Sequence, residues 1–365
     1  MDNLYTSLPQ YPLKEDMWDK ISNEHRPIVC YGMGNGADKL IKRLEEYGVG
    51  ISDFFASDGF VRGHSFHNKR VLSFSEIKEK YEEFVILLSF ASNREDVLLM
   101  LSEIDAAYDM YIPDMPVAGE EYFDKDFYNK NYSSIIAAYE SLSDEESRAT
   151  FCSVINYKLF GKLEYLESCF ASRDELYSVL PCAKIENIVD AGAYNGDTLA
   201  EAKLYFPRLK NAIAIEPDKK NFKKLGKYIE AESTFSIKAV NAAAWCENAV
   251  GTFSDSGNRN STLIATASFE HKETDVMLSS IDGLVSNRID YIKYDVEGAE
   301  LEAIKGADKV ILANRPSMLI SAYHRSRDIF FLVNYLREKY PFYKIYMRRL
   351  RCVPAWELDI LLVAD

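Results

Sequence analysis

Short apolar segments alternate with helical patterns in two separate stretches of the chain, and this alternation constrains the fold more than any other feature. In the second stretch, turn residues bound apolar segments at 185–190, 212–216, 236–239, 291–295 and 317–322. Helical patterns begin after Asp197, Asp218, Gly298 and Asp328. Such alternation predicts a parallel sheet with helices on its faces. The last two apolar segments, 343–349 and 359–364, lie too close together for a helical crossover, so we expect an antiparallel pair.

A shorter alternation occupies the first third of the chain. Apolar segments at 27–31, 50–58 and 84–90 surround a Gly-rich turn and a helical pattern, as in a βαβ unit. Between the two stretches, residues 122–180 are acidic and carry apolar residues at three-to-four spacing. We therefore predict a Rossmann-like α/β domain at 1–118, a helical connector at 119–180 and a second α/β domain at 181–365.

Composition excludes several classes of function. The net charge of −14 and the pI near 5.0 work against nonspecific binding to nucleic acid or to an anionic membrane. The longest apolar runs are too short to span a bilayer, and the N-terminus lacks the pattern of a secretory signal. The six cysteines form no CxxC motif, so we expect a reducing compartment and a cytoplasmic protein.

Carboxylates gather after the apolar segment at 291–295. The sequence DYIKYDVEGAELEAIKGA places Asp295 and Glu297 between a predicted strand and a predicted helix. Ligands of open α/β sheets bind at that edge, although acidic residues in a first helical turn are also favoured by the helix dipole. Asp295, Glu297 and Glu300 are oxygen ligands that suit Mg²⁺, but their spacing on one turn makes joint coordination doubtful, and we predict no metal.

A glycine loop earlier in the chain is expected at the same edge of the sheet. In IVDAGAYNGDTLAEA, Asp190, Gly192 and Gly196 follow a strand, in a spacing that differs from the dinucleotide GxGxxG. We expect Asp190 to bond to turn amides, while Asp197 and Thr198 either cap the helix or touch a ligand. Glu216 ends the next strand, where a carboxylate can accept hydrogen bonds from the two ribose hydroxyls of an adenosine; its alternative is a solvated strand end.

Small residues follow the third strand of this stretch. The sequence VNAAA leaves room for a flat adenine ring, with Asn241 at its edge and Ala242 beside it. The alternative is close packing of a tight bend.

Together these residues resemble a known family. VDAGAYNGDTL, AIEPD, VNAAAW, STL at 261–263, DYIKYDVEGAELEAIKGA and ISAYH are similar to the FkbM-type S-adenosylmethionine-dependent methyltransferases, over about half of the chain. The resemblance implies a class I methyltransferase sheet, mixed and seven-stranded, and methyl transfer to the hydroxyl of a sugar, a glycan or a related metabolite. It also implies that S-adenosyl-L-methionine is held by these cofactor-binding residues: Asp190, Gly192, Ala193, Tyr194, Asn195, Gly196, Thr198, Glu216, Pro217, Asn241, Ala242 and Asp295. Tyr194 departs from the smaller residue expected in the loop.

Methyl transfer to a hydroxyl benefits from a general base. His324 ends the predicted strand LISAYH and is our first candidate, with Asp295 and Glu297 as rivals; a strand-end histidine is also often a structural hydrogen-bonding residue. Arg325 and Arg327 either hold an anionic substrate or lie in a solvated loop. Ser261 and Thr262 belong to a loop that could close over the substrate.

The first domain offers a different function. Its Gly32–Gly36 loop follows a strand and Asp58 ends the next one, a pattern that could hold the pyrophosphate of a nucleotide-sugar. The first rival is therefore an NAD(P)-dependent sugar-modifying enzyme, although Tyr157 and Lys158 are adjacent and form no convincing catalytic pair. The second rival is a non-catalytic protein with a decayed cofactor site, against which Gly192, Gly196 and Glu216 argue. The oligomeric state stays open.

Overall fold

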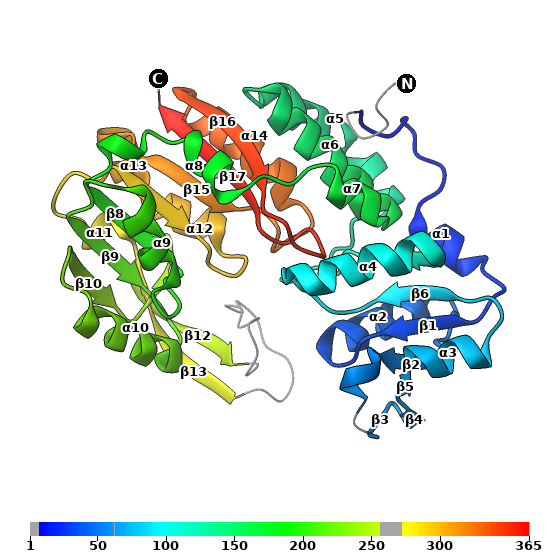
Figure 1. The fold of residues 1–365 in the computed structure, drawn as a ribbon. Helices are drawn as coiled ribbons and strands as arrows, with labels where there is room; N and C mark the ends of the chain where they lie inside the picture. The colour runs from blue at the N-terminus through cyan, green and yellow to red at the C-terminus, as the bar shows by residue number, and fades with distance from the viewer. Residues whose placement is uncertain (1–6, 62, 256–271, 365) are drawn as a thin grey trace.

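The computed structural model describes residues 7–61, 63–255 and 272–364 of the chain. These residues form a small α/β domain, a group of helices and a larger α/β domain (Figure 1). The predicted loop residues Ser261 and Thr262 lie outside the described residues.

The first domain is a parallel five-stranded sheet in the order β5-β2-β1-β6-β7. Its strands are β1 (Ile28–Tyr31), β2 (Asp53–Ala56), β5 (Leu72–Ser73), β6 (Val85–Leu88) and β7 (Asp109–Tyr111). Its helices are α1 (Met17–Ser22), α2 (Asn35–Glu46), η1 (Asp58–Phe60), α3 (Phe74–Lys80) and α4 (Glu95–Ala107), and a hairpin of β3 (Ser65–Phe66) and β4 (Lys69–Arg70) extends from it. The predicted strands are present as β1, β2 and β6, which are parallel and buried along their whole length. The short edge strands β5 and β7 were not predicted.

Helices follow where the sequence predicts a connector. They are α5 (Lys125–Ser141), α6 (Glu145–Phe160), α7 (Leu163–Glu167) and α8 (Arg173–Ser178), before the short η2 (Cys182–Lys184). Helix α6 is buried over most of its length, and its Phe151 and Tyr157 are fully buried. The aromatic residues of this segment therefore form core, as their spacing indicates.

The second domain is a mixed seven-stranded sheet in the order β10-β9-β8-β14-β15-β17-β16. Its strands are β8 (Asn187–Ala191), β9 (Asn211–Ile215), β10 (Ser236–Val240), β14 (Tyr291–Tyr294), β15 (Ser317–Ser321), β16 (Tyr343–Arg349) and β17 (Leu358–Ala364). The main helices are α9 (Asp197–Tyr205), α10 (Lys219–Ala231), α12 (Glu300–Lys305), α13 (Asp308–Asn314) and α14 (Asp328–Lys339). Strand β17 runs antiparallel to β15 and β16, which confirms the predicted terminal pair.

A small sheet beside the second domain was not predicted. Strands β11 (Ala243–Ala244), β13 (Lys272–Ser279) and β12 (Ala249–Asp255) pair in that order, and α11 (Ile281–Leu284) follows. The long strands β12 and β13 project below the larger sheet in Figure 1.

The parts of the chain share one core. A single cluster of buried apolar residues takes Val29 from the first domain, Phe151 from the connector and Ile292 from the second domain. Backbone hydrogen bonds in both directions also join Ser92, after β6, to Val353, before β17 (2.7 and 2.9 Å).

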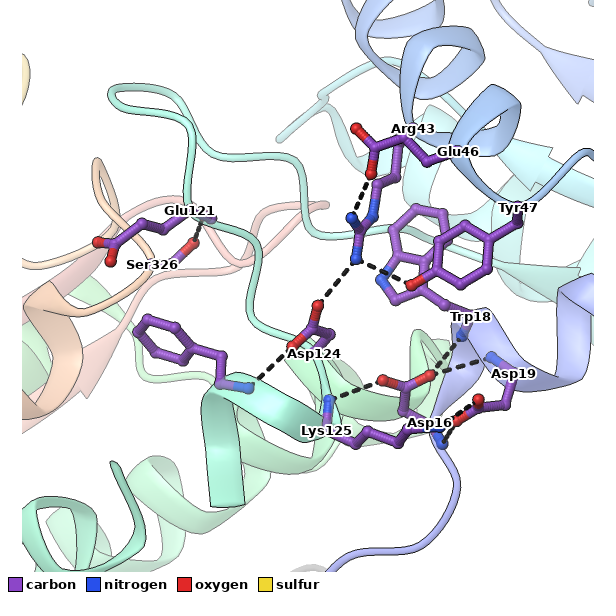
Figure 2. Close-up of polar contacts among 11 residues, drawn as sticks. Asp16, Trp18, Asp19, Arg43, Glu46, Tyr47, Glu121, Asp124, Lys125 and Ser326 are labelled. Atoms are coloured by element: carbon purple, nitrogen blue, oxygen red, sulfur yellow. Dashed lines mark hydrogen bonds and ion pairs between the residues drawn. The ribbon is translucent and has the colours of Figure 1, made fainter. Parts of the chain in front are cut away.

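Polar contacts fix the junction between the first domain and the connector (Figure 2). The Arg43 guanidinium pairs with Asp124 at 2.8 Å and lies 4.3 Å from the Tyr122 ring centroid. Asp16 caps α1 and also accepts a hydrogen bond from the Lys125 backbone N–H at 2.7 Å. These contacts hold the beginning of α5 against the first domain.

Within the described part of the chain, no helix is both long enough and apolar enough to cross a membrane.

Candidate active site

A cavity of about 400 Å³ opens at the carboxyl ends of β8, β9 and β14. Strand β8 lies between β9 and β14, so the order of the strands reverses here: β9 and β10 follow on one side of β8, and β14 and β15 on the other. Open α/β sheets bind ligands at such a reversal. The cavity wall contains the following predicted residues: Gly192, Tyr194, Thr198, Glu216, Pro217, Asp295 and Glu297. The glycine loop and the acidic turn are thus brought together.

Gly192 allows the two loops to touch. Its backbone has φ +93°, and a Cβ atom added there would lie 1.9 Å from the backbone oxygen of Asp295. Any side chain would therefore separate the glycine loop from the end of β14.

Glu216 holds the glycine loop in place. Its carboxylate accepts hydrogen bonds from the backbone N–H groups of Tyr194 (2.9 Å) and Asp218 (2.8 Å), and the residue is 6% exposed. Burial raises the pKa of Glu216 to about 7, against the opposing effect of these two hydrogen bonds. Each carboxylate oxygen has a second lone pair, so the group retains capacity for two further donors.

Asp295 lies beside a buried lysine. Lys293 donates to its carboxylate at 3.1 Å, and the Tyr323 hydroxyl donates to it at 3.4 Å. Burial opposes the charge of Asp295, but Lys293 and His324 outweigh it and lower the pKa. Asp295 is therefore ionised at neutral pH.

His324 is surrounded by carboxylates. Its Nδ1 lies 2.9 Å from Glu300, and its Nε2 lies 3.5 Å from Glu297 and 3.6 Å from Asp295. Among the described residues neither ring nitrogen has a hydrogen bond of good geometry, and the charge of Glu300 is the largest effect of a carboxylate on the ring. Burial opposes the charge, but the three carboxylates, Glu300 first, raise the pKa of His324 to about 10. The ring is therefore an imidazolium at neutral pH, and an imidazolium has no free lone pair to accept a proton.

Glu297 has an unusual backbone. Its φ of +54° is uncommon for a residue with a side chain, and such strain often marks functional sites. Burial raises the pKa of Glu297 to about 7, with a smaller opposing effect of His324, while 39% of its side chain stays exposed. A carboxylate with this pKa, open to the cavity, can accept a proton near neutral pH.

The cavity is strongly acidic. Six carboxylates line it against two basic side chains, Arg173 and Lys293. An acidic wall favours a cationic ligand and repels an anionic one such as a pyrophosphate.

Half of the predicted cofactor residues do not reach the cavity wall, namely Asp190, Ala193, Asn195, Gly196, Asn241 and Ala242. The Asp190 carboxylate is buried without a hydrogen-bond partner among the described residues, so the expected bonds to turn amides are absent. Asn241 donates instead to the backbone oxygens of Glu216 (2.8 Å) and Pro217 (3.1 Å). Its neighbours Ala243 and Ala244 line the cavity in its place.

The remaining three have local structural roles. Ala193 is fully buried in an apolar cluster, and Gly196 precedes α9, where a Cβ atom would lie 2.7 Å from the Tyr228 ring. Asn195 accepts a hydrogen bond from the Asp197 N–H at 3.2 Å. Tyr194 does line the cavity, and Lys224 lies 5.4 Å from its ring centroid.

Sequence reasoning missed several residues of the wall. They come from other parts of the fold and include Asn93, Arg173 and Glu357. No local motif surrounds them, because only the packing of α8, the β6 loop and the β16–β17 connection brings them to this edge. Lys293 was inside a recognised motif, and its position two residues before Asp295 on one strand face was the available signal.

The Gly32–Gly36 loop borders a separate cavity of about 370 Å³, between the first domain and Trp356. Asp58 does not face it: β2 ends at Ala56, and the Asp58 carboxylate accepts from Ser75 Oγ at 2.8 Å. Tyr157 is fully buried, and Lys158 pairs with buried Asp114 at 2.6 Å, so neither side chain is available for catalysis. In the described ranges, no group of three or more His, Cys, Asp or Glu residues is arranged to hold a metal ion.

Comparisons with known proteins agree with this geometry. Residues 190–342 match the family model of the methyltransferase FkbM domain. A crystal structure of methyltransferase FkbM from Methylobacillus flagellatus has the same fold, with a TM-score of 0.69 and 18% identity, over 99% of this chain and 96% of that one. No curated protein matches the chain significantly.

Two further solved structures match about half of the chain. They are a precorrin-6y C5,15-methyltransferase from Geobacter metallireducens (TM-score 0.34, 13% identity, 54% of this chain and 94% of that one) and fibrillarin from Aeropyrum pernix with bound S-adenosyl-L-methionine (TM-score 0.33, 12% identity, 50% and 69%). Residues 190–342 of this chain thus match the methyltransferase FkbM domain, and the chain as a whole shares the fold of the FkbM methyltransferase from Methylobacillus flagellatus.

Proposed function

We propose that the protein transfers the methyl group of S-adenosyl-L-methionine to a hydroxyl of a sugar, a glycan or a related metabolite. The observation that carries the proposal is the acidic cavity between Gly192, Glu216 and Asp295, with Glu297 on its wall. The six free cysteines agree with action in the cytoplasm.

The residues of the cavity fit this cofactor. Glu216 has two unused acceptor positions for the ribose hydroxyls, and Gly192 lets the glycine loop lie directly against the end of β14 that carries Asp295. Asp295 is an ionised acceptor for the amino group, and Arg173 and Lys293 are the cations available to its carboxylate. When bound, the cofactor supplies a methyl group already activated on a cationic sulfur, which the acidic wall suits.

Glu297 is the proposed general base. It borders the cavity, and its raised pKa matches proton removal from a hydroxyl near neutral pH better than the pKa of Asp295 or His324 does. The geometry of the free protein thus favours Glu297 over His324, the first candidate from the sequence.

His324 then acts as a positioning residue. Its positive charge lies between Glu297 and Glu300, and it would keep the pKa of Glu297 from rising further. Glu300 in turn accepts hydrogen bonds from the N–H groups of Val296 (3.1 Å) and Gly298 (3.2 Å), so it supports both the imidazolium and the turn that carries Glu297.

Calorimetric titration with S-adenosylhomocysteine tests the cofactor site. We expect saturable binding by the wild-type protein, weakened at least about tenfold in Glu216→Ala because two ribose hydrogen bonds to a charged group are lost. Glu145→Ala is the matched control, since this glutamate lies on α6 with its side chain 89% exposed. Absence of binding by folded wild-type protein refutes the proposal and turns attention to a nucleotide-sugar at the Gly32–Gly36 loop.

A further inference from the structure

A second cavity adjoins the first at Glu297. It has a volume of about 180 Å³, close to the size of one sugar ring, and Glu297 and Ala299 belong to the walls of both cavities. Its other walls include Trp245, Arg325, Arg327 and Phe331. The candidate base Glu297 thus lies on a wall that the two cavities share.

Besides Glu297, which both cavities share, three carboxylates line the second cavity, and each of these three has a partner. Glu300 faces His324 at 2.9 Å, and Glu302 pairs with Lys305 at 2.7 Å. Asp328 accepts from the Arg325 backbone N–H at 3.0 Å, and burial raises its pKa to about 7, so it carries only part of a charge. Glu300 and Glu302 are thus engaged by other residues, and Asp328 is the one of the three that Arg325 influences, since the Arg325 charge opposes the rise of its pKa.

The two arginines of this wall have no acidic partner. No carboxylate of the described residues lies within 4.0 Å of either guanidinium, whereas most arginines of this acidic protein are paired. Arg325 is held by one hydrogen bond from its Nε to the Gly298 oxygen (2.8 Å), which leaves its terminal N–H groups available. Arg327 is exposed, and its guanidinium lies 5.0 Å from the Phe331 ring centroid. The planar guanidinium of an arginine holds several N–H donors in a fixed arrangement, which suits the paired oxygens of a carboxylate or a phosphate.

An aromatic side chain completes the wall. Trp245 is half-buried, and its backbone N–H donates a hydrogen bond to the Ser279 oxygen at 3.0 Å. A partly exposed indole in a cavity offers an apolar face to the C–H groups of a sugar ring.

We propose that the second cavity is the acceptor subsite and that it binds an anionic sugar, with its carboxylate or phosphate at Arg325 and Arg327 and a hydroxyl at Glu297. This inference rests on the proposed function and adds the chemical class of the acceptor. It differs from a solvated loop because the arginines share one cavity with an aromatic residue and with the candidate base.

The test uses the protein saturated with S-adenosylhomocysteine. Glucuronate, glucose 6-phosphate and glucose are titrated separately by calorimetry into wild type, Arg327→Gln and the control Arg337→Gln, which changes an exposed arginine of α14 outside both cavities. We expect at least one acidic sugar to bind about tenfold more tightly than glucose, a preference lost in Arg327→Gln and kept in the control. Preference for glucuronate identifies a carboxylate, and preference for glucose 6-phosphate identifies a phosphate.

The outcomes separate the two proposals. If neither acidic sugar binds more tightly than glucose, or if Arg327→Gln keeps the preference, the acceptor inference is overturned while cofactor binding still stands. If S-adenosylhomocysteine itself does not bind, the proposed function fails, and the inference fails with it. Unchanged cofactor affinity in Arg327→Gln verifies that this variant is folded.

Discussion

Replacing Gly192 with alanine should damage the site strongly, because two separate costs fall on this residue. The backbone φ of +93° costs about 1–3 kcal/mol for a residue with a side chain. The added Cβ would lie 1.9 Å from the Asp295 oxygen, and relieving such overpacking costs typically about 1–3 kcal/mol. We therefore expect the free energy of unfolding to fall by about 2–6 kcal/mol.

Alanine substitutions at three other glycines allow the backbone cost and the steric cost to be measured separately. Gly34 has φ +95° but open space around its Cβ position, so Gly34→Ala measures the backbone cost alone. Gly36 has no such φ, but its Cβ would lie 2.0 Å from the Ser89 oxygen, so Gly36→Ala measures the collision alone. Gly226 lies inside α10 without either problem, and Gly226→Ala should stabilise the protein by about 0.5–1 kcal/mol.

Urea unfolding of the four variants and titration with S-adenosylhomocysteine give the two measurements. We expect Gly192→Ala to lose stability by about the sum of the Gly34→Ala and Gly36→Ala losses, and to be the one variant of the four that also loses cofactor affinity. The reasoning is refuted if Gly192→Ala unfolds at the wild-type urea concentration, since the Asp295 oxygen could not then lie so close to the loop. It is also refuted if the cofactor affinity of Gly192→Ala is unchanged.

Three further predictions concern carboxylates with raised pKa values. Because the pKa of free Glu216 is raised to about 7 and hydrogen bonds from a ribose favour its ionised form, affinity for S-adenosylhomocysteine should rise from pH 6 to pH 8; calorimetry should find no such rise from this group in Glu216→Gln. Glu297→Gln should keep the wild-type affinity for S-adenosylhomocysteine but lower kcat about 10²–10⁴-fold in a methyl-transfer assay with the acidic sugar that binds in the calorimetric test. A wild-type kcat in this variant would contradict the role of Glu297 as base. Burial raises the pKa of Asp359 to about 8, so the folded state holds a proton that the unfolded state has released, and stability from this group is lost as pH rises through about 8. Asp359→Asn should therefore gain in Tm relative to wild type between pH 5 and pH 8, and a constant difference in Tm would contradict this assignment.

Much of the second domain could be predicted because its strands are short, largely apolar segments bounded by turn residues. Strand β16 has the predicted bounds, and β14 and β15 differ from the prediction by one residue at their ends. Asp218 caps α10 as its position suggests. The two-residue strands β5 and β11 carry too few side chains for any periodicity, and β7 has only three residues and is followed directly by a segment that contains prolines.

Side-chain direction and charge were harder to predict. The sequence locates the loop that holds Asp190, Asn195 and Gly196, but only the packed backbone decides that Gly192 and Tyr194 face the cavity. A histidine at a strand end suggests a base of ordinary pKa, whereas the charge of His324 depends on Glu300, which approaches it from another element. Such effects depend on burial and on distances of a few ångströms, which a linear pattern does not contain.

The contacts of the loop at 323–327 indicate what the chain before the second domain contributes to the active site. The His324 backbone oxygen accepts a hydrogen bond from the Ala118 N–H at 2.8 Å, and Ser326 Oγ donates to the Glu121 oxygen at 2.5 Å (Figure 2). A few residues later, Asp124 is tied to Arg43 of the first domain. The loop that carries His324 and Arg325 is therefore supported from outside the sheet to which it belongs. Residues 118–121 would then support the acceptor side of the active site. The predicted boundary at 118/119 therefore falls within this supporting segment and not in a free linker.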